Sequence, residues 1–277
     1  MKVKLLDKRI FTIFLQITSA VSAGLSTLLL FIDIPEELKF PSLIAFLLAL
    51  LVTYLGVWIW SNRINHVEID IEGTSVTVKV GDIFQQPGLK VIAFNEYFDT
   101  SVNNEIISEK SLNGIFIKSH LKIPVDELDK LIEQHRFEDD EVAGENSKRL
   151  AGKRIKYRLG TIFVQKDFLL TAMSKFDESN RATLTMPEYL EFLIRFWDRV
   201  NKVYAQQSVS VPIFGSGITR IKGHRNISDE DLLKIMLWTF RISEMRFKYP
   251  ANLSIIIHKD KIGQINLLDI KMLKSGV

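Results

Sequence analysis

The sequence predicts an α/β fold that follows a pair of membrane-spanning helices, and two observations carry this prediction. Residues 10–32 contain no charged side chain over 23 positions, and residues 42–60 contain none over 19. Beyond position 66, apolar residues alternate between the period of a strand and that of a helix. We therefore expect a two-helix transmembrane hairpin over residues 1–64 and an α/β domain with a mixed sheet over residues 65–277.

The two apolar segments have the length that a bilayer requires. About 20 apolar residues in a helix cross the roughly 30 Å hydrocarbon core. Four Lys or Arg residues precede the first segment and Arg63 follows the second, whereas the connecting residues 33–41 contain only Lys39. Because cytoplasmic flanks are rich in Lys and Arg, both termini are expected in the cytoplasm. Tyr54, Trp58 and Trp60 would then lie at the cytoplasmic interface, which amphipathic rings favour.

Two alternatives remain open for this hairpin. The first segment has a basic start and a small-residue stretch at Val21-Ser22-Ala23, as a cleaved signal peptide would. Its apolar run continues to Ile32, and a second apolar segment follows at once, which favours a hairpin. Small residues such as Ala20 and Gly24 permit close helix packing, either within one hairpin or between hairpins of several chains. Two helices cannot enclose a pore, so permeation would require an oligomer.

Composition excludes several function classes. Residues beyond 66 hold 30 Lys or Arg and 29 Asp or Glu, so this part is nearly neutral and lacks the basic surface that nucleic acid requires. The chain has no cysteine, which excludes disulfides, Cys-ligated zinc and a cysteine nucleophile. The five histidines are scattered without metal-ligand spacing, so no metal site is expected. The apolar segments carry no charge, which argues against an ion-transport site.

The domain beyond residue 65 reads as strands interleaved with helices. Period-two alternation or short apolar runs predict strands over 67–71, 76–80, 89–94, 115–117, 155–159, 161–165, 168–172, 208–212 and 253–258. A helix is predicted over 124–135, and Thr185 begins a capping box for a second helix that extends to about Ala205. Ser228 begins a third helix, with acidic residues in its first turn. Residues 138–153 are predicted to form an exposed loop whose charges face solvent.

Three short stretches carry polar chemistry at the ends of predicted strands. The loop in Val211–Arg220, VPIFGSGITR, can aim backbone N–H groups at a phosphate, because glycines allow close approach and Arg220 adds charge. It has neither the GxxxxGK[ST] nor the GxGxxG spacing. Gly81-Asp82-Ile83 places a carboxylate where it can accept from an exocyclic amine or from local backbone. Asn95 follows a buried strand, where it can bind a ribose or cap the next segment.

The order of these stretches resembles a macro domain, the ADP-ribose-binding α/β/α module, over about residues 67–260. The stretch Val91–Thr100, VIAFNEYFDT, followed by Ser111-Leu112-Asn113-Gly114, is more specific. It resembles the divergent macro domain of the Thoeris anti-phage defence effectors. The two-helix segment resembles the anchor of the membrane-bound subtype of those effectors.

The resemblance implies a role for each matching position. Asp82 matches the adenine-reading acid with Ile83 beside it, Asn95 matches the residue near the distal ribose, and Phe214–Arg220 match the diphosphate loop. Residues Ser111–Gly114 replace the usual glycine-rich loop, which puts hydrolysis in doubt. His258 is either a stacking partner for a base or a surface histidine at a strand end. The implied ligand-binding residues are Asp82, Ile83, Asn95, Ser111, Leu112, Gly114, Phe214, Gly215, Ser216, Gly217, Ile218, Thr219, Arg220 and His258.

The resemblance also implies a function: a sensor and effector in the bacterial inner membrane that is not an enzyme and uses no cofactor. Its ligand would be an ADP-ribose derivative, either a cyclic isomer or a conjugate, made by a functional TIR-domain partner. Binding would act on the lipid bilayer through homo-oligomeric hairpins. A membrane-tethered ADP-ribosyl or nucleotide hydrolase is the first alternative, and a passive tethered ADP-ribose-binding module is the second. The sequence leaves the messenger's identity and the oligomer size open.

Overall fold

A computed structural model describes residues 3–177, 179–217, 219–224, 226–248 and 250–272. The chain divides into two compact units. The first contains the chain up to Val67 together with Ile265–Met272, and the second contains Glu68–Gln264. One domain is predicted over residues 65–277, whereas this division places Ile265–Met272 with the hairpin.

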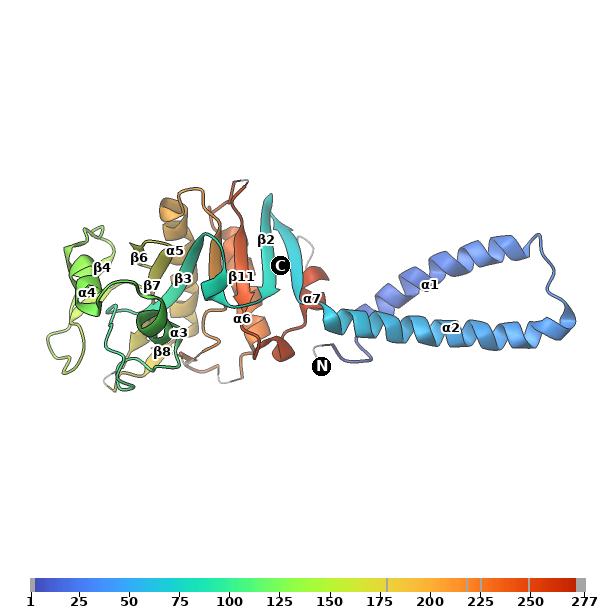
Figure 1. Cartoon of the computed structure of the whole chain (residues 1–277), viewed down its shortest axis with the longest axis horizontal. Coiled ribbons are helices and arrows are strands. Elements are labelled where there is room, and N and C mark those ends of the chain that lie inside the picture. Colours follow the sequence, from blue (N-terminus) through green and yellow to red (C-terminus); the bar gives the residue numbers. More distant parts are fainter. Residues whose placement is uncertain (1–2, 178, 218, 225, 249, 273–277) are drawn as a thin grey trace. The chain divides into compact units, whose positions relative to one another are not determined.

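The first unit is a hairpin of two long helices, α1 (Lys8–Leu29) and α2 (Glu36–Arg63), which run side by side in Figure 1. Both are long and apolar enough to cross a membrane, judged by length and composition alone. The turn that joins them is shorter than predicted, because α2 begins at Glu36 and includes Pro41. Two glutamates in the first turn of α2 favour this early start, since they complement the positive end of the helix dipole.

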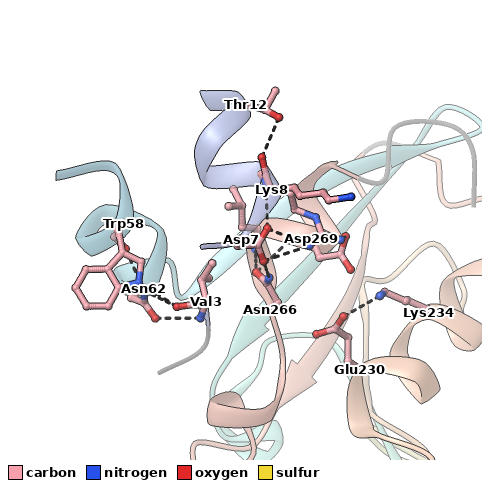
Figure 2. Close-up of polar contacts among 12 residues, drawn as sticks. Val3, Asp7, Lys8, Thr12, Trp58, Asn62, Glu230, Lys234, Asn266 and Asp269 are labelled. Carbon is pink, nitrogen blue, oxygen red and sulfur yellow. Dashed lines mark hydrogen bonds and ion pairs between the residues drawn. The ribbon is translucent and has the colours of Figure 1, made fainter. Parts of the chain in front are cut away.

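The base of the hairpin is held by the short helix α7 (Leu267–Met272), as Figure 2 shows. Asn266 donates from Nδ2 to Asp7 Oδ2 at 3.2 Å, and the guanidinium of Arg9 forms an ion pair with Asp269. Beneath these polar contacts, Leu268 packs with buried side chains from both helices, among them Ile10. We call the polar set Asp7, Arg9, Asn266 and Asp269 the base clasp.

The aromatic residues at the end of α2 contact the segment that precedes α1. The indole Nε1 of Trp58 donates to Val3 O at 3.1 Å, and the hydroxyl of Tyr54 donates to Leu5 O at 2.6 Å. Asn62 binds Val3 as well, by accepting from its N–H at 3.1 Å (Figure 2). The polar groups of Tyr54 and Trp58, which were predicted to lie at the membrane interface, therefore bind the backbone of Val3 and Leu5.

The second unit is built on a mixed sheet in the order β1-β2-β11-β9-β3-β7-β8-β10, with β6 beside β7. Its strands are β1 (His66–Ile71), β2 (Thr74–Val80), β3 (Leu89–Asn95), β6 (Ile162–Gln165), β7 (Phe168–Phe176), β8 (Ala182–Leu184), β9 (Val209–Pro212), β10 (Arg220–Ile221) and β11 (Leu253–Ile257). β4 (Val142–Glu145) and β5 (Ile155–Tyr157) form a separate pair. The central pairs β2–β11, β11–β9, β9–β3 and β3–β7 are parallel, whereas β6 and β8 run antiparallel to β7.

Helices cover both faces of this sheet (Figure 1). The helices of this unit are η1 (Ile83–Gln85), α3 (Leu112–Ile115), the π-helical turn η2 (Phe116–His120), α4 (Val125–Gln134), α5 (Met186–Val203), α6 (Asp229–Ile242) and η3 (Ile262–Gln264). Ile92 and Phe94 of β3 pack in one apolar cluster with α3, η2 and α4. Leu170 and Ala172 of β7 belong to the same cluster. Leu169 and Thr171, which alternate with them along β7, are also fully buried and point to the other face of the sheet. On that face α5 packs on β7, and α6 packs on α5.

The long helices begin where their capping residues predict. Thr185 and Ser228 each form a capping box, at the starts of α5 and α6. Burial acts to raise the pKa of Glu188, but hydrogen bonds from Lys175 and from Thr185 outweigh it and lower that pKa to about 2. Glu188 therefore remains an anion at the positive end of α5.

Two predictions about local structure were wrong. Residues 115–117 were predicted as a strand, but Ile115 ends α3 and Phe116 begins η2, so that Phe116 and Ile117 pack in the apolar cluster. Three consecutive apolar residues do not distinguish a strand from a buried helical turn. The predicted exposed loop 138–153 contains β4, and its charges are not only solvated: Arg199 of α5 pairs with Glu138 and Asp140, each at 2.7 Å.

Candidate functional site

The second unit contains a cavity of about 920 Å³ at the carboxyl ends of β3, β7 and β9. It forms because β3 and β9 are paired only at Leu89 with Val209 and at Lys90 with Ser210. The two strands are not paired beyond Lys90, and residues 93–95 and 212–213 line the space between them. Ligands of open α/β sheets bind at such a position, outside the carboxyl ends of the strands.

The loop after β9 lines one side of this cavity, and Phe214 anchors it. The side chain of Phe214 is buried, and its ring meets those of Phe192 and Phe196 edge-on. Its carbonyl accepts a hydrogen bond from the hydroxyl of Tyr189 at 2.9 Å. The loop is therefore tied to α5 immediately before its two glycines.

The two glycines of the loop have different conformational needs. Gly215 has φ +82°, a conformation that L side chains rarely adopt. Gly217 is exposed and is not among the glycines with a positive φ. Apart from its chain neighbours, no heavy atom of the described residues lies within 4 Å of a Cβ added there. Between them, Ser216 donates from its hydroxyl to Ile213 O at 2.8 Å. This tight turn sets the backbone at residues 214–217 along the cavity.

Asn95 lies at the floor of the cavity, at the end of β3. Its Oδ1 accepts from the N–H groups of Tyr97 and Asp99, at 3.0 and 3.3 Å. Its Nδ2 donates to the carboxylate of Asp99 at 2.8 Å. The carboxylate can only accept, which fixes the orientation of the Asn95 amide. A second N–H of the same amide remains for a ligand.

A third wall comes from residues 104–113, which precede and begin α3. Ser111 caps α3 by accepting from Gly114 N at 3.2 Å, and Leu112 lies beside it in the cavity lining. Gly114 does not line the cavity; an added Cβ there would lie 2.2 Å from Ser108 O, so glycine is required for packing. Residues Ser111–Gly114, which were predicted to stand in place of a glycine-rich loop, are the cap and first turn of α3.

The fourth wall is the end of β7 together with the segment that leads to β8. Phe176, Asp177, Ser179, Asn180 and Arg181 line the cavity there. Hydrogen bonds from Arg181 lower the pKa of Asp177, whose Oδ2 lies 2.9 Å from Arg181 Nε.

The rim carries two further cations, Lys110 and Lys222, both exposed. Among the described residues of the lining, Glu105 and Asp177 are the acidic ones, and Asp177 is paired with Arg181. The exposed ammonium groups of Lys110 and Lys222 can attract an anionic ligand.

Of the predicted ligand-binding residues, eight are brought together around the cavity: Asn95, Ser111, Leu112, Phe214, Gly215, Ser216, Gly217 and Thr219. Their role in binding stays a prediction. Ile218 and the side chain of Arg220 lie outside the described residues.

The remaining predicted residues lie elsewhere. The carboxylate of Asp82 accepts from Phe84 N at 2.9 Å and caps η1, while Ile83 is buried; neither is in the cavity lining. His258 is exposed and lies 3.4 Å from Asp260, also away from the lining.

The sequence did not predict the walls formed by residues 104–108, 176–177 and 179–183. These segments carry no motif, and only their polar composition between apolar runs marks them as loops. Among the described residues, no group of three or more His, Asp or Glu side chains is arranged to hold a metal ion.

Comparison with known proteins gives three similarities. A family model described as Thoeris protein ThsA, Macro domain, matches residues 76–258. The Thoeris protein ThsA of Bacillus amyloliquefaciens (strain Y2) is 36% identical over 266 residues, which cover 93% of this chain and 87% of that protein. Among solved structures, a mutant of the Oceanobacillus iheyensis macrodomain has a TM-score of 0.43 at 14% identity, covering 76% of this chain and 98% of its own. The same macrodomain with ADP has a TM-score of 0.40 at 14% identity, with coverage of 75% and 94%.

Proposed function

Because this chain belongs to the Thoeris ThsA macro-domain family, we propose that it is an anti-phage defence effector whose cavity binds a nucleotide messenger derived from ADP-ribose. The single observation that carries the proposal is the cavity itself, with a glycine-containing turn on one side and Asn95 on its floor. Its volume of about 920 Å³ lies at the upper end of the range for small-molecule sites, which suits a nucleotide.

The chemistry of the walls supports a diphosphate-containing ligand. The backbone at Gly217 lies where, among the described residues beyond its chain neighbours, no heavy atom would hinder the close approach of a phosphate oxygen. Lys110 and Lys222 supply positive charge at the rim. The Asn95 amide offers a donor to a ribose hydroxyl at the floor.

The protein acts as a binder rather than a hydrolase in this proposal. Macro-domain hydrolases position a water with a glycine-rich loop, whereas Ser111 here caps a helix and Gly114 is packed against Ser108. A hydrolase that uses the same cavity is the alternative. The two are distinguished by product formation when the protein is incubated with a ligand that it binds.

The messenger signal reaches a membrane through the hairpin. The exposed apolar surfaces of α1 and α2 suit a lipid environment, with both ends of the hairpin in the cytoplasm. Outside their own helix backbone and chain neighbours, Gly24 and Gly56 have no heavy atom of the described residues within 4 Å of an added Cβ, which leaves room for the close approach of helices from other copies. A TIR-domain protein would make the messenger, and homo-oligomeric hairpins would disrupt the bilayer. A passive anchor is the alternative for these helices.

The chain passes between the two units twice, after Val67 and after Gln264, and each connection enters the hairpin unit near its base. A conformational change in the ligand-binding domain can therefore be transmitted to α2 and to α7 through these two connections. A messenger can drive such a change only by binding more tightly to one of two states.

Calorimetric titration of the full-length protein in detergent tests the binding function. The titrants are ADP-ribose, NAD, cyclic ADP-ribose isomers and ADP-ribose conjugates, and chromatography of the products tests turnover. Tight binding of one derivative without turnover supports the proposal; a folded protein that binds none of them contradicts it. The full chain is used because a fragment that begins at Asn65 would leave Leu268 without its partners on α1 and α2.

Two substitutions locate the ligand within the protein. Gly217→Leu adds a side chain in open space at the cavity, so it should abolish binding and leave the thermal midpoint unchanged. Asp82→Ala tests the adenine-reading role that the family resemblance implies. Unchanged binding in Gly217→Leu would exclude the loop, and unchanged binding in Asp82→Ala would restrict Asp82 to capping η1.

Vesicle leakage tests the membrane function. The full-length protein is reconstituted into dye-loaded vesicles, and the binding derivative is added. Leakage that depends on the derivative supports action through the hairpin. Retained cell toxicity after replacement of α1 and α2 by an unrelated anchor would instead support passive tethering.

A further inference from the structure

Arg149, from the segment between β4 and β5, is a buried charge in a stretch that reads as a solvated loop. Its side chain is 7% exposed, and its partner Asp99 is 1% exposed. The guanidinium binds both carboxylate oxygens of Asp99, at 3.1 and 2.6 Å, and also donates to Lys153 O at 2.6 Å. The Cζ atom of the guanidinium lies over the ring of Tyr97, 3.9 Å from the ring centre.

This guanidinium joins two walls of the cavity. Through Asp99 Oδ2 it shares an acceptor with Nδ2 of Asn95, on the floor. Through its NH2 group it donates to Asn180 Oδ1 at 3.1 Å, in the wall between β7 and β8. Asn180 has φ +55°, in the left-handed region that asparagine adopts more readily than most residues.

The same contacts fix which end of each amide a ligand meets. Arginine can only donate, so the bond to Asn180 uses the carbonyl end of that amide and leaves its NH2 end. Asp99 can only accept, so the NH2 group of Asn95 faces it. One N–H of that group donates to Asp99, and the second N–H remains for a ligand. Both asparagines therefore offer donors to acceptor oxygens of a ligand.

Stability alone does not explain this arrangement. A buried ion pair is weak evidence for stability, because desolvation of both charges offsets their attraction. The site instead uses features that distinguish arginine from lysine: two parallel bonds to one carboxylate, a third bond to an amide, and a stacked planar face.

We infer that Arg149 is a positioning residue of the messenger pocket: it holds Asn95 and Asn180 so that their amide N–H groups face acceptor oxygens of the bound nucleotide. This inference rests on the proposed function, since it concerns the same cavity. Residues 146–153 are then a structural support of the pocket rather than a loop at its edge.

Four full-length variants test the inference: Arg149→Met, Arg149→Lys, the double variant Asp99→Asn with Arg149→Met, and Lys148→Ala as an exposed neighbouring control. Each is measured by calorimetry with the ADP-ribose derivative that the unmodified protein binds, by thermal unfolding, and by hydrogen exchange at residues 179–183. Arg149→Met should raise Kd about tenfold or more, as loss of a hydrogen bond to the ligand would. It should also speed exchange at 179–183, while Lys148→Ala should change neither.

The double variant separates positioning from stability. It removes the unpaired buried carboxylate, so it should recover thermal midpoint relative to Arg149→Met while its Kd stays raised. If the double variant recovered both its affinity for the ADP-ribose derivative and its thermal midpoint, Arg149 would act only through stability, and the inference would be overturned. If Arg149→Met does not fold, Arg149→Lys carries the test, because one ammonium cannot hold Asp99 and Asn180 together and should still raise Kd several-fold.

The inference and the proposed function fail in different ways. An unmodified protein that binds no ADP-ribose derivative contradicts the proposed function. If hydrogen exchange at residues 179–183 is the same in Arg149→Met and Arg149→Lys as in the unmodified protein, the inference is overturned. This result does not depend on whether a ligand is bound. Unchanged Kd in both variants overturns it as well.

Discussion

Removal of one hydroxyl, by Tyr189→Phe, tests how the loop after β9 is held. The Tyr189 side chain is fully buried, and its hydroxyl donates to the carbonyl of Phe214 at 2.9 Å. Burial raises the pKa of Tyr189 far above its usual range, so the hydroxyl keeps its proton wherever the protein is folded. Phenylalanine preserves the ring, and the substitution removes only this donor.

The expected cost follows from leaving a buried carbonyl short of one partner, about 1–2 kcal/mol of unfolding free energy. For a unit of this size, 1 kcal/mol corresponds to roughly 2–4 °C, so the thermal midpoint should fall by about 2–8 °C. Phe214 begins the turn that lines the cavity, so we also expect Kd for the nucleotide to rise about two- to tenfold.

The assay is thermal unfolding of the full-length protein in detergent, followed by calorimetry with the binding derivative. Tyr204→Phe, at the end of the same helix, is the matched control. It removes the same atom from a half-buried ring that packs edge-on against Phe247, and among the described residues its hydroxyl makes no hydrogen bond. A midpoint in Tyr189→Phe equal to that of the control would show that Phe214 O is satisfied elsewhere. Lost stability with unchanged Kd would show that this bond does not position the loop.

Three further predictions concern other parts of the chain. Gly215→Ala should destabilise by about 1–2 kcal/mol because of its positive φ, whereas Gly217→Ala should stay within about 0.5 kcal/mol; chemical denaturation compares the two, and equal losses would contradict the assigned backbone conformations. The pKa of Glu188 is about 2 when folded, below its ordinary value of 4.5, so its contribution to stability is present above pH 4.5 and is lost as pH falls toward 2; Glu188→Gln should flatten that part of a plot of thermal midpoint against pH, and an unchanged slope would refute the assignment. Arg9→Met should expose the base of the hairpin by breaking the ion pair to Asp269, measured as faster proteolysis between residues 259 and 272; protection equal to that of the unmodified chain would show that the apolar contacts suffice.

Local signals predicted much of the fold. The capping boxes at Thr185 and Ser228 determine where α5 and α6 begin, because the side chain and the backbone it caps are three residues apart. The hairpin follows from two uncharged runs of sufficient length. The strand predicted at 115–117 was wrong because that run has no period long enough to separate the two structures, and its packing partners on β3 and β7 decided the outcome.

The site was predictable only where a residue type implied its own geometry. Glycines in a bend after a strand indicated the loop at 214–217, and a polar residue at a strand end indicated Asn95. Arg149 could not be recognised in this way, because its partner Asp99 is 50 residues away and nothing near either residue indicates the pairing. The charge run around it therefore appeared solvated until the structure brought the two together.

The base clasp also orders events during synthesis. Asp7 is made 259 residues before its partner Asn266. At about 5–20 residues per second, roughly 10–50 s separate the two. The domain between them has time to fold while the helices of the hairpin stand without α7. The base clasp can form only after Asn266 and Asp269 have been translated. In nascent or prematurely terminated chains, the hairpin therefore lacks these contacts.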